Sequence, residues 1–170
     1  MTPPGCDFLN QAHPALRASP ALRAVAVHAL LEVALRCSVR FRLEFDRARL
    51  LTALGATSAA ALLPSLPACA SSEGPLARRD ELLDDEKARL LRQVLSFERD
   101  MWTDLPINYI ERVVLFDAQG DVVLRASDSA EFILCALSNM EHEDLIERYR
   151  AAGIPAEVVE SVDVDINQGV

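Results

Sequence analysis

The stretch PALRAVAVHALLEVALR, Pro20–Arg36, decides the fold that we expect from the sequence. Ser19 before it is a good N-cap, and Pro20 suits the first helical position because its missing N–H would have no partner there. Ala, Val and Leu cover most of the helix surface, and polar residues are few. A helix that is apolar nearly all round has to be covered on several sides, so this stretch predicts a buried central helix.

A transmembrane helix is the main alternative for the same stretch. Its 17 residues are at the short limit for crossing a bilayer, it contains His28 and Glu32, and Arg40 and Arg42 follow closely. The first 20 residues lack the basic start and the apolar run of a signal peptide. We therefore expect a cytoplasmic protein that does not bind membranes.

Charge is distributed unevenly along the 170 residues. The net charge is −9, but residues 1–60 carry +3 and residues 61–170 carry −12, with no basic residue after Arg150. Nucleic-acid binding needs clustered Lys and Arg, so this distribution argues against a nucleic-acid partner. A basic protein partner is compatible with it, and so is the plainer explanation that the acidic residues keep the protein soluble.

Two regions carry the sequence signals of β-strands. In residues 38–46 apolar and polar side chains alternate, which predicts a half-buried strand with Arg40 and Arg42 on its outer face. Residues 109–116 and 121–126 flank a short turn that contains a glycine, which predicts a hairpin. Together these segments predict a three-stranded antiparallel sheet with one face on the helices.

The other periodic segments predict helices. The longest covers residues 80–101, where Leu83, Leu90 and Val94 share one apolar stripe, and where acids precede arginines as the helix dipole favours. Shorter helices are expected at residues 47–54, 57–63, 129–139 and 141–152, with a further turn or two within residues 155–162. The fold class is therefore α+β, with helices packed around a central apolar helix and a small, about three-stranded antiparallel sheet.

We expect one domain over residues 1–170, with three irregular segments. Residues 1–18 are rich in proline and predict an irregular N-terminal arm. Residues 64–78 include the sequence PSLPACASSEGP and predict a mobile loop. Residues 163–170 predict a frayed tail.

No motif for catalysis or cofactor binding stands out. The chain has no grouped glycines for a phosphate loop and no G-x-S-x-G sequence. Its four cysteines are far apart, which argues against a zinc site and suits a reducing compartment. His142, in the sequence EHED, lacks the spacing of a zinc protease helix and is typical of a solvated helix start, and His28 beside Glu32 is typical of a structural histidine. We therefore predict no catalytic residue, no cofactor and no metal site, although the enzyme question stays open.

Three functional hypotheses remain. The first is a protein-binding module that occludes or regulates a protein partner of basic character, for example an immunity protein or antitoxin that neutralises a toxin. The second is a ligand-sensing α+β module with an apolar pocket between the sheet and the central helix. The third is an enzyme whose site assembles from scattered residues, such as a histidine against a cysteine or carboxylate. The oligomeric state is not predicted.

The binding hypothesis makes a specific prediction about the surface. The region after residue 140 holds eight acids and only two arginines, so its potential should be negative whatever the packing. The predicted partner-binding residues are Glu141, Glu143, Asp144, Glu147, Glu157, Glu160, Asp163 and Asp165. If these acids serve only solubility, the face with Arg40 and Arg42 is the next surface to test.

Overall fold

The computed structural model describes residues 5–64, 76–95, 110–127 and 132–168. Most of the expected mobile loop, residues 65–75, lies outside these ranges, and so do residues 96–101, the end of the longest expected helix. The mobility of that loop therefore stays a prediction.

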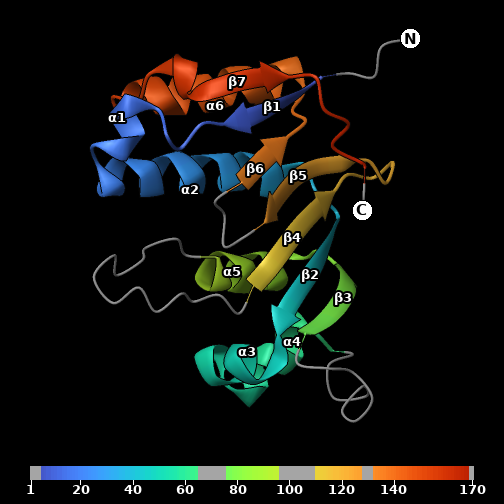
Figure 1. Cartoon of the computed structure of the whole chain (residues 1–170). Coiled ribbons are helices and arrows are strands. Elements are labelled where there is room, and N and C mark those ends of the chain that lie inside the picture. The colour runs from blue at the N-terminus through green and yellow to red at the C-terminus, as the bar shows by residue number, and fades with distance from the viewer. Residues whose placement is uncertain (1–4, 65–75, 96–109, 128–131, 169–170) are drawn as a thin grey trace.

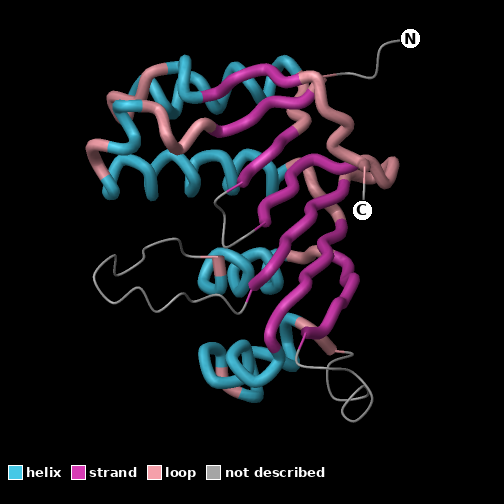
Figure 2. Tube along the Cα trace, viewed as in Figure 1, coloured by secondary structure: helices cyan, strands magenta, loops and turns pink. Residues whose placement is uncertain are grey.

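One antiparallel sheet of seven strands organises the described chain (Figures 1 and 2). The strand order is β3-β2-β4-β5-β6-β1-β7, and every neighbouring pair is antiparallel. The strands are β1 (Cys6–Leu9), β2 (Arg40–Asp46), β3 (Leu76–Leu82), β4 (Ile110–Phe116), β5 (Val122–Ser127), β6 (Phe132–Cys135) and β7 (Val159–Val162). The expected small, three-stranded sheet is wrong, because the predicted strand and hairpin are only the middle of a larger sheet.

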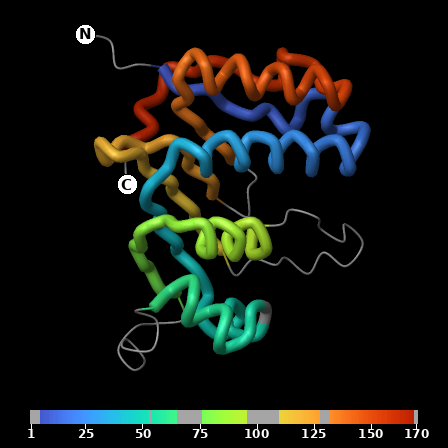
Figure 3. Tube along the Cα trace, turned by 180° about the vertical axis from the view of Figure 1, so that it is seen from behind, coloured from blue at the N-terminus to red at the C-terminus, as the bar shows by residue number. Residues whose placement is uncertain are grey.

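The helices gather on one side of this sheet. Figure 3, seen from behind, shows α2, α5 and α6 in front of the strands, whereas Figure 1 shows the strands in front. The helices are α1 (Pro14–Arg17), α2 (Pro20–Arg36), α3 (Arg47–Leu54), α4 (Ala56–Leu62), α5 (Asp85–Val94) and α6 (Asn139–Ala151), with a short 3-10 helix, η2 (Ala156–Val158). We call the covered side of the sheet the helix face and the other side the open face.

Helix α2 has the bounds that the sequence predicts. The Ser19 hydroxyl accepts a hydrogen bond from the Leu22 N–H, and Pro20 occupies the first turn. In the C-terminal half of α2, the apolar residues Leu30, Leu31, Val33, Ala34 and Leu35 are buried. Tyr149 of α6 is also fully buried, and its hydroxyl donates to the Ala26 carbonyl at 2.8 Å. This bond fixes α6 against α2.

The helix face carries the main core. Strand β2 contributes Phe41, Leu43 and Phe45, each with no exposed surface, because the alternation predicted from the sequence places them on this side. They pack in one continuous cluster with buried residues of α2, α3, α4, α5 and α6. The predicted hairpin is also confirmed: β4 pairs with β5, and Gly120 in the turn has a φ of +89°.

Two expected helices contain strands instead, and the turn or two expected within residues 155–162 is the short η2 followed by β7. Residues 76–82 form β3, and the helix expected from residue 80 is the shorter α5, whose N-cap is Asp84. Within the helix expected at residues 129–139, Phe132–Cys135 forms β6, with Ile133 and Cys135 buried on the helix face. The tertiary pairing of these strands outweighs the local pattern.

Both ends of the chain are more ordered than expected. The predicted irregular arm contains β1, which lies between β6 and β7 in the sheet, followed by α1. The segment 163–168, expected to be frayed, returns across the open face, where Ile166 packs with Val114, Phe116 and Val122. The Asn167 side-chain oxygen accepts from the Val122 N–H at 3.3 Å. The open face is thus covered in part by the C-terminal segment, whose course Figure 1 shows.

Another part of the open face carries ion pairs. The Arg42 guanidinium donates two hydrogen bonds to the Asp80 carboxylate, at 2.6 and 2.8 Å, and Arg40 donates a third at 3.2 Å. Both arginines lie over the Phe116 ring, 4.1 and 5.3 Å from its centre. Arg112 pairs with Glu44 at 3.6 Å. Charged side chains therefore pair with one another where no helix covers the sheet.

Candidate functional site: an acidic groove between α2 and α6

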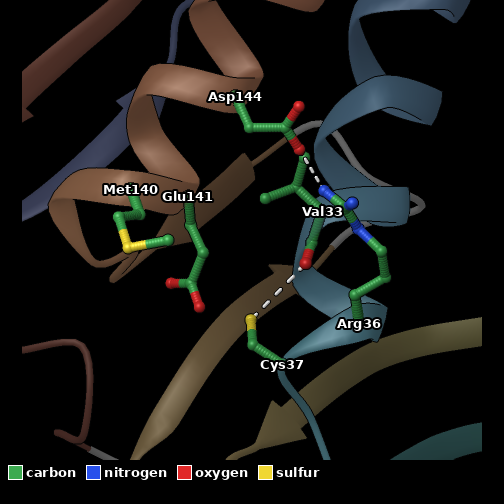
Figure 4. Close-up of a pocket in the computed structure, with 6 residues that line it drawn as sticks. All are labelled: Val33, Arg36, Cys37, Met140, Glu141 and Asp144. Carbon is green, nitrogen blue, oxygen red and sulfur yellow. Dashed lines mark hydrogen bonds and ion pairs between the residues drawn. The ribbon is translucent and has the colours of Figure 1, made fainter.

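A groove opens where the end of α2 meets the start of α6. The start of α6 is fixed by a capping box, in which the Ser138 hydroxyl accepts from the Glu141 N–H while the Glu141 carboxylate accepts from the Ser138 N–H. The cavity measures about 310 Å³. Figure 4 shows its six lining residues, Val33, Arg36, Cys37, Met140, Glu141 and Asp144. The groove therefore brings together α2 and two of the predicted partner-binding acids.

The two walls of the groove differ in character. The α6 wall carries Met140, which is 81% exposed, beside Glu141 and Asp144. The α2 wall carries Cys37, and Arg36, which forms an ion pair with Asp144 across the groove (Figure 4). The site thus combines an exposed apolar side chain, carboxylates and one arginine.

Cys37 is not poised to act as a nucleophile. Its thiol donates to the backbone carbonyls of Val33 and Ala34 at 3.4 and 3.3 Å. Burial raises the pKa of Cys37 to about 12, and the nearby carboxylate of Glu141 adds to this shift. Because the thiolate is the reactive form of cysteine, the groove does not support thiol catalysis at neutral pH.

The structure separates the eight predicted acids. Four lie on α6, one on η2, one on β7 and two in the segment after β7. Helix α6 belongs to the helix face, whereas the segment with Asp163 and Asp165 leads to the open face at Ile166. The predicted acidic surface is therefore divided between two sides of the molecule. Of the four acids on α6, Glu141 and Asp144 line the groove, and Glu143 and Glu147 lie on the same helix.

Intramolecular partners already neutralise some of these acids. Asp144 pairs with Arg36 and Arg148, and its hydrogen bond from Arg36 holds the pKa of its carboxyl below the usual range. Glu147 pairs with Arg150. These pairs lie at the surface, where solvent screens them, so each neutralises its carboxylate only in part.

Other predicted acids are not paired with a basic side chain in the described residues. Glu143 on α6, Glu157 on η2 and Asp163 after β7 are exposed and make no ion pair within the described part of the chain. Glu160 accepts a hydrogen bond from the Asn10 side chain at 2.7 Å, and Asp165 accepts one from the Asn167 N–H at 2.9 Å. The sequence alone counts all eight equally, because it cannot show which arginines fold back onto them.

A second polar cluster lies at the other side of α6. Nδ1 of His142 lies 3.1 Å from the Asp7 carboxylate of β1, and the Ser161 hydroxyl of β7 donates to the same carboxylate at 3.0 Å. The carboxylate lies between the other two groups, so the serine is not activated by the histidine as in a hydrolytic triad. No local pattern indicates this contact, because Asp7 and His142 are 135 residues apart.

Metal binding and membrane insertion find no support in the described residues. Within residues 5–64, 76–95, 110–127 and 132–168, no group of three or more His, Cys, Asp or Glu side chains is placed to hold a metal ion. None of the described helices is both long enough and apolar enough to pass through a bilayer. No family model, curated protein or solved structure matches this chain.

Proposed function

We propose that this protein is a small acidic, cytoplasmic protein-binding module that occludes or regulates a basic protein partner. An immunity protein or antitoxin that neutralises a toxin is the concrete form of this function. The docking surface is on α6: Met140, Glu141 and Asp144, which line the groove, together with Glu143 and Glu147 on the same helix. We call it the α6 surface.

The observation that carries the proposal is the exposure of Met140 at the groove. Its side chain is 81% exposed and stands beside Glu141 and Asp144. Methionine is flexible and polarizable, so it adapts to the apolar part of a partner. An apolar side chain surrounded by carboxylates suits a partner that presents an apolar residue flanked by lysine or arginine.

Electrostatics supports the same surface. Glu143 has no ion pair within the described residues, and Glu147 has only the exposed Arg150 as partner, with side chains 68% and 71% exposed. These carboxylates keep a negative potential over α6. Such a potential increases the rate at which a basic partner associates and makes that rate sensitive to salt.

The two alternatives have less support. The ligand-sensing hypothesis expects an apolar pocket between the sheet and the central helix, but Leu30 and Leu31 of α2 are buried there in one cluster with Phe41 and Leu43 of β2. The enzyme hypothesis expects a nucleophile or base in a pocket. As a nucleophile the groove offers the Cys37 thiol, whose raised pKa disfavours the reactive form, and of its two carboxylates Asp144 is held in ion pairs with Arg36 and Arg148.

Association kinetics test the proposal. The partner is captured from the native host with the wild-type chain as bait, identified, and produced separately. The double variant Glu143→Lys, Glu147→Lys should slow its association by about tenfold at low salt, because two steering carboxylates become cations. Met140→Ala should instead speed dissociation, since it removes an apolar contact.

A matched control separates the α6 surface from total charge. The double variant Glu157→Lys, Asp163→Lys changes the net charge by the same amount but lies off this surface. It should associate nearly as fast as wild type. Equal rates for wild type and both double variants at low salt would refute the proposal, leave the acids as solubility groups, and direct the search to the open face at Arg40 and Arg42.

A further inference from the structure

Strand β3 is a long edge of the sheet. It is seven residues long and, among the described strands, pairs with β2 alone, whereas the opposite edge strand, β7, has four residues. Along its outer side, β3 presents backbone N–H and C=O groups that no other described strand pairs. Leu76 and Leu82, at its two ends, are 54% and 71% exposed.

The two leucines and two charges of β3 share one face. In the register with β2, Leu76 lies opposite Asp46, Arg78 opposite Glu44, Asp80 opposite Arg42 and Leu82 opposite Arg40. Because side chains alternate along a strand, Leu76, Arg78, Asp80 and Leu82 all point to the open face. Strand β3 therefore presents the pattern apolar, basic, acidic, apolar beside the edge that no described strand pairs.

This pattern is complementary to its own reverse. When β3 is placed antiparallel to an identical strand about Arg79, Leu76 lies opposite Leu82 and Arg78 lies opposite Asp80. The symmetry repeats both pairs, so on the open face two apolar pairs and two pairs of opposite charge form across the axis. A two-fold axis perpendicular to the sheet relates antiparallel strands in this way and closes the assembly at two chains.

We propose that β3 binds β3 of a second copy of this chain, so that two seven-stranded sheets form one continuous sheet across a homodimer. The two-fold axis passes at Arg79. This proposal does not depend on the proposed function, because β3 lies at the end of the sheet order and contributes no residue to the groove that the α6 surface borders.

Arg79 is the residue where like charges would meet. Its side chain points to the helix face, is only 9% exposed, and donates to the Arg78 carbonyl at 2.6 Å. The guanidinium is thus folded against its own chain rather than extended toward the partner strand. Repulsion at the axis therefore does not offset the attraction between the paired side chains of the open face.

The first test is the mass of the full chain in solution. Sedimentation velocity over a concentration series should give twice the 18.7 kDa of one chain. Arg78→Glu places a glutamate opposite Asp80 at both symmetric positions and should weaken the dimer by at least about tenfold. Arg89→Glu, at an exposed position of α5, is the control with the same change of net charge and should leave the dimer intact. A wild-type monomer throughout, or equal weakening by the two variants, would overturn the proposal.

The second test reads the register and does not rely on charge. In a Cys37→Ser, Cys69→Ser background, Leu76→Cys and Leu82→Cys are produced as separate proteins. In the proposed register, position 76 faces position 82 of the partner, while equal positions lie about 20 Å apart, six residues at about 3.3 Å each. A short bifunctional maleimide should therefore cross-link the mixture of the two proteins but neither protein alone. Cross-linking of either protein with itself, or none in the mixture, would overturn the proposal.

Discussion

The two faces of the sheet are built by different means. The helix face is one continuous apolar cluster, to which α2, α3, α4, α5 and α6 all contribute. The open face is assembled from parts: a small apolar cluster under the C-terminal segment, and ion pairs among Arg40, Arg42, Asp80, Glu44 and Arg112. The helix face is stabilised by burial, which is cooperative over the whole cluster. The open face is stabilised by local contacts, which solvent screens.

This difference sets the expected order of mutational effects. A substitution on the helix face disturbs residues that contact several elements at once, and the cavity or charge it creates has no route to solvent. A substitution on the open face disturbs one layer that already borders water. Stability should therefore depend strongly on the first face and weakly on the second.

The largest effect is expected for Leu30→Asp on α2. Leu30 is 1% exposed, so an aspartate there would bury an unpaired charge at a cost of several kcal/mol or more and prevent folding. Soluble yield and circular dichroism measure the outcome. Val25→Asp, at a position of the same helix that is 45% exposed, is the control and should fold. A folded Leu30→Asp variant would contradict the importance of burial on the helix face.

Phe41→Ala should have the second largest effect. The Phe41 ring is fully buried between β2 and the helices, and its removal leaves a cavity, so we expect a loss of about 3–5 kcal/mol in the free energy of unfolding. Urea denaturation followed by fluorescence or circular dichroism measures it. Val39→Ala, at a position 45% exposed, should cost far less. Equal losses for both variants would show that burial on this face does not control stability.

The sequence predicted the helix face well because its signals are local. The apolar, helix-favouring composition and the N-cap of α2, the alternation of β2 and the turn of the β4–β5 hairpin all follow from residues close together in the chain. The bounds of α2 were correct at both ends, and Phe41, Leu43 and Phe45 were placed on the buried side. Each of these patterns lies within a single segment, so it can be recognised without knowledge of the tertiary contacts.

The missed strands lack that pattern. On its helix side β3 has Ala77, Arg79 and Glu81, while its leucines point to the open face, so no apolar alternation marks it. The run Phe132–Cys135 is apolar on both faces, and a four-residue run of this kind does not distinguish a strand from a helix. Strand β1 pairs with β7 across most of the chain, which no local signal can show.

Ile166→Ala tests the smaller apolar cluster of the open face. Ile166 is 5% exposed and packs with Val114, Phe116 and Val122, so its truncation should cost about 2 kcal/mol, the lower end for a buried isoleucine, because the cluster lies at the surface. Urea denaturation measures it. Val164→Ala, at a position 46% exposed in the same segment, is the control. No difference between the two variants would mean that the C-terminal segment does not stabilise the sheet. The frayed tail predicted from the sequence would then be correct.

The candidate site was only partly predictable. The acids of α6 were identified from composition, which predicts a negative region but not which of its carboxylates are paired. The sequence could not show that Arg36 reaches Asp144 from a helix 108 residues earlier, or that Met140 stands exposed at a groove. Intramolecular pairing decides which carboxylates remain available, and pairing is a property of the tertiary structure.

The smallest effect is expected for Asp80→Asn on the open face. The hydrogen bonds from Arg42 hold the pKa of the Asp80 carboxyl below its ordinary value of 3.8, and Arg40 adds to this. A lowered pKa in the folded state means that the charged form stabilises the fold above pH 3.8, and that this contribution is lost as the pH falls through the folded pKa. Because the pairs are partly exposed, we expect each to contribute about 0.2–1 kcal/mol at neutral pH and less at high salt.

Urea denaturation from neutral pH to below pH 3.8 should show a steeper loss of stability for wild type than for Asp80→Asn. Asp163→Asn, which removes an exposed acid without an ion pair in the described residues, should follow the wild-type curve. If Asp80→Asn instead loses as much as Phe41→Ala, the ion pairs are part of the core, and the contrast between the two faces does not hold.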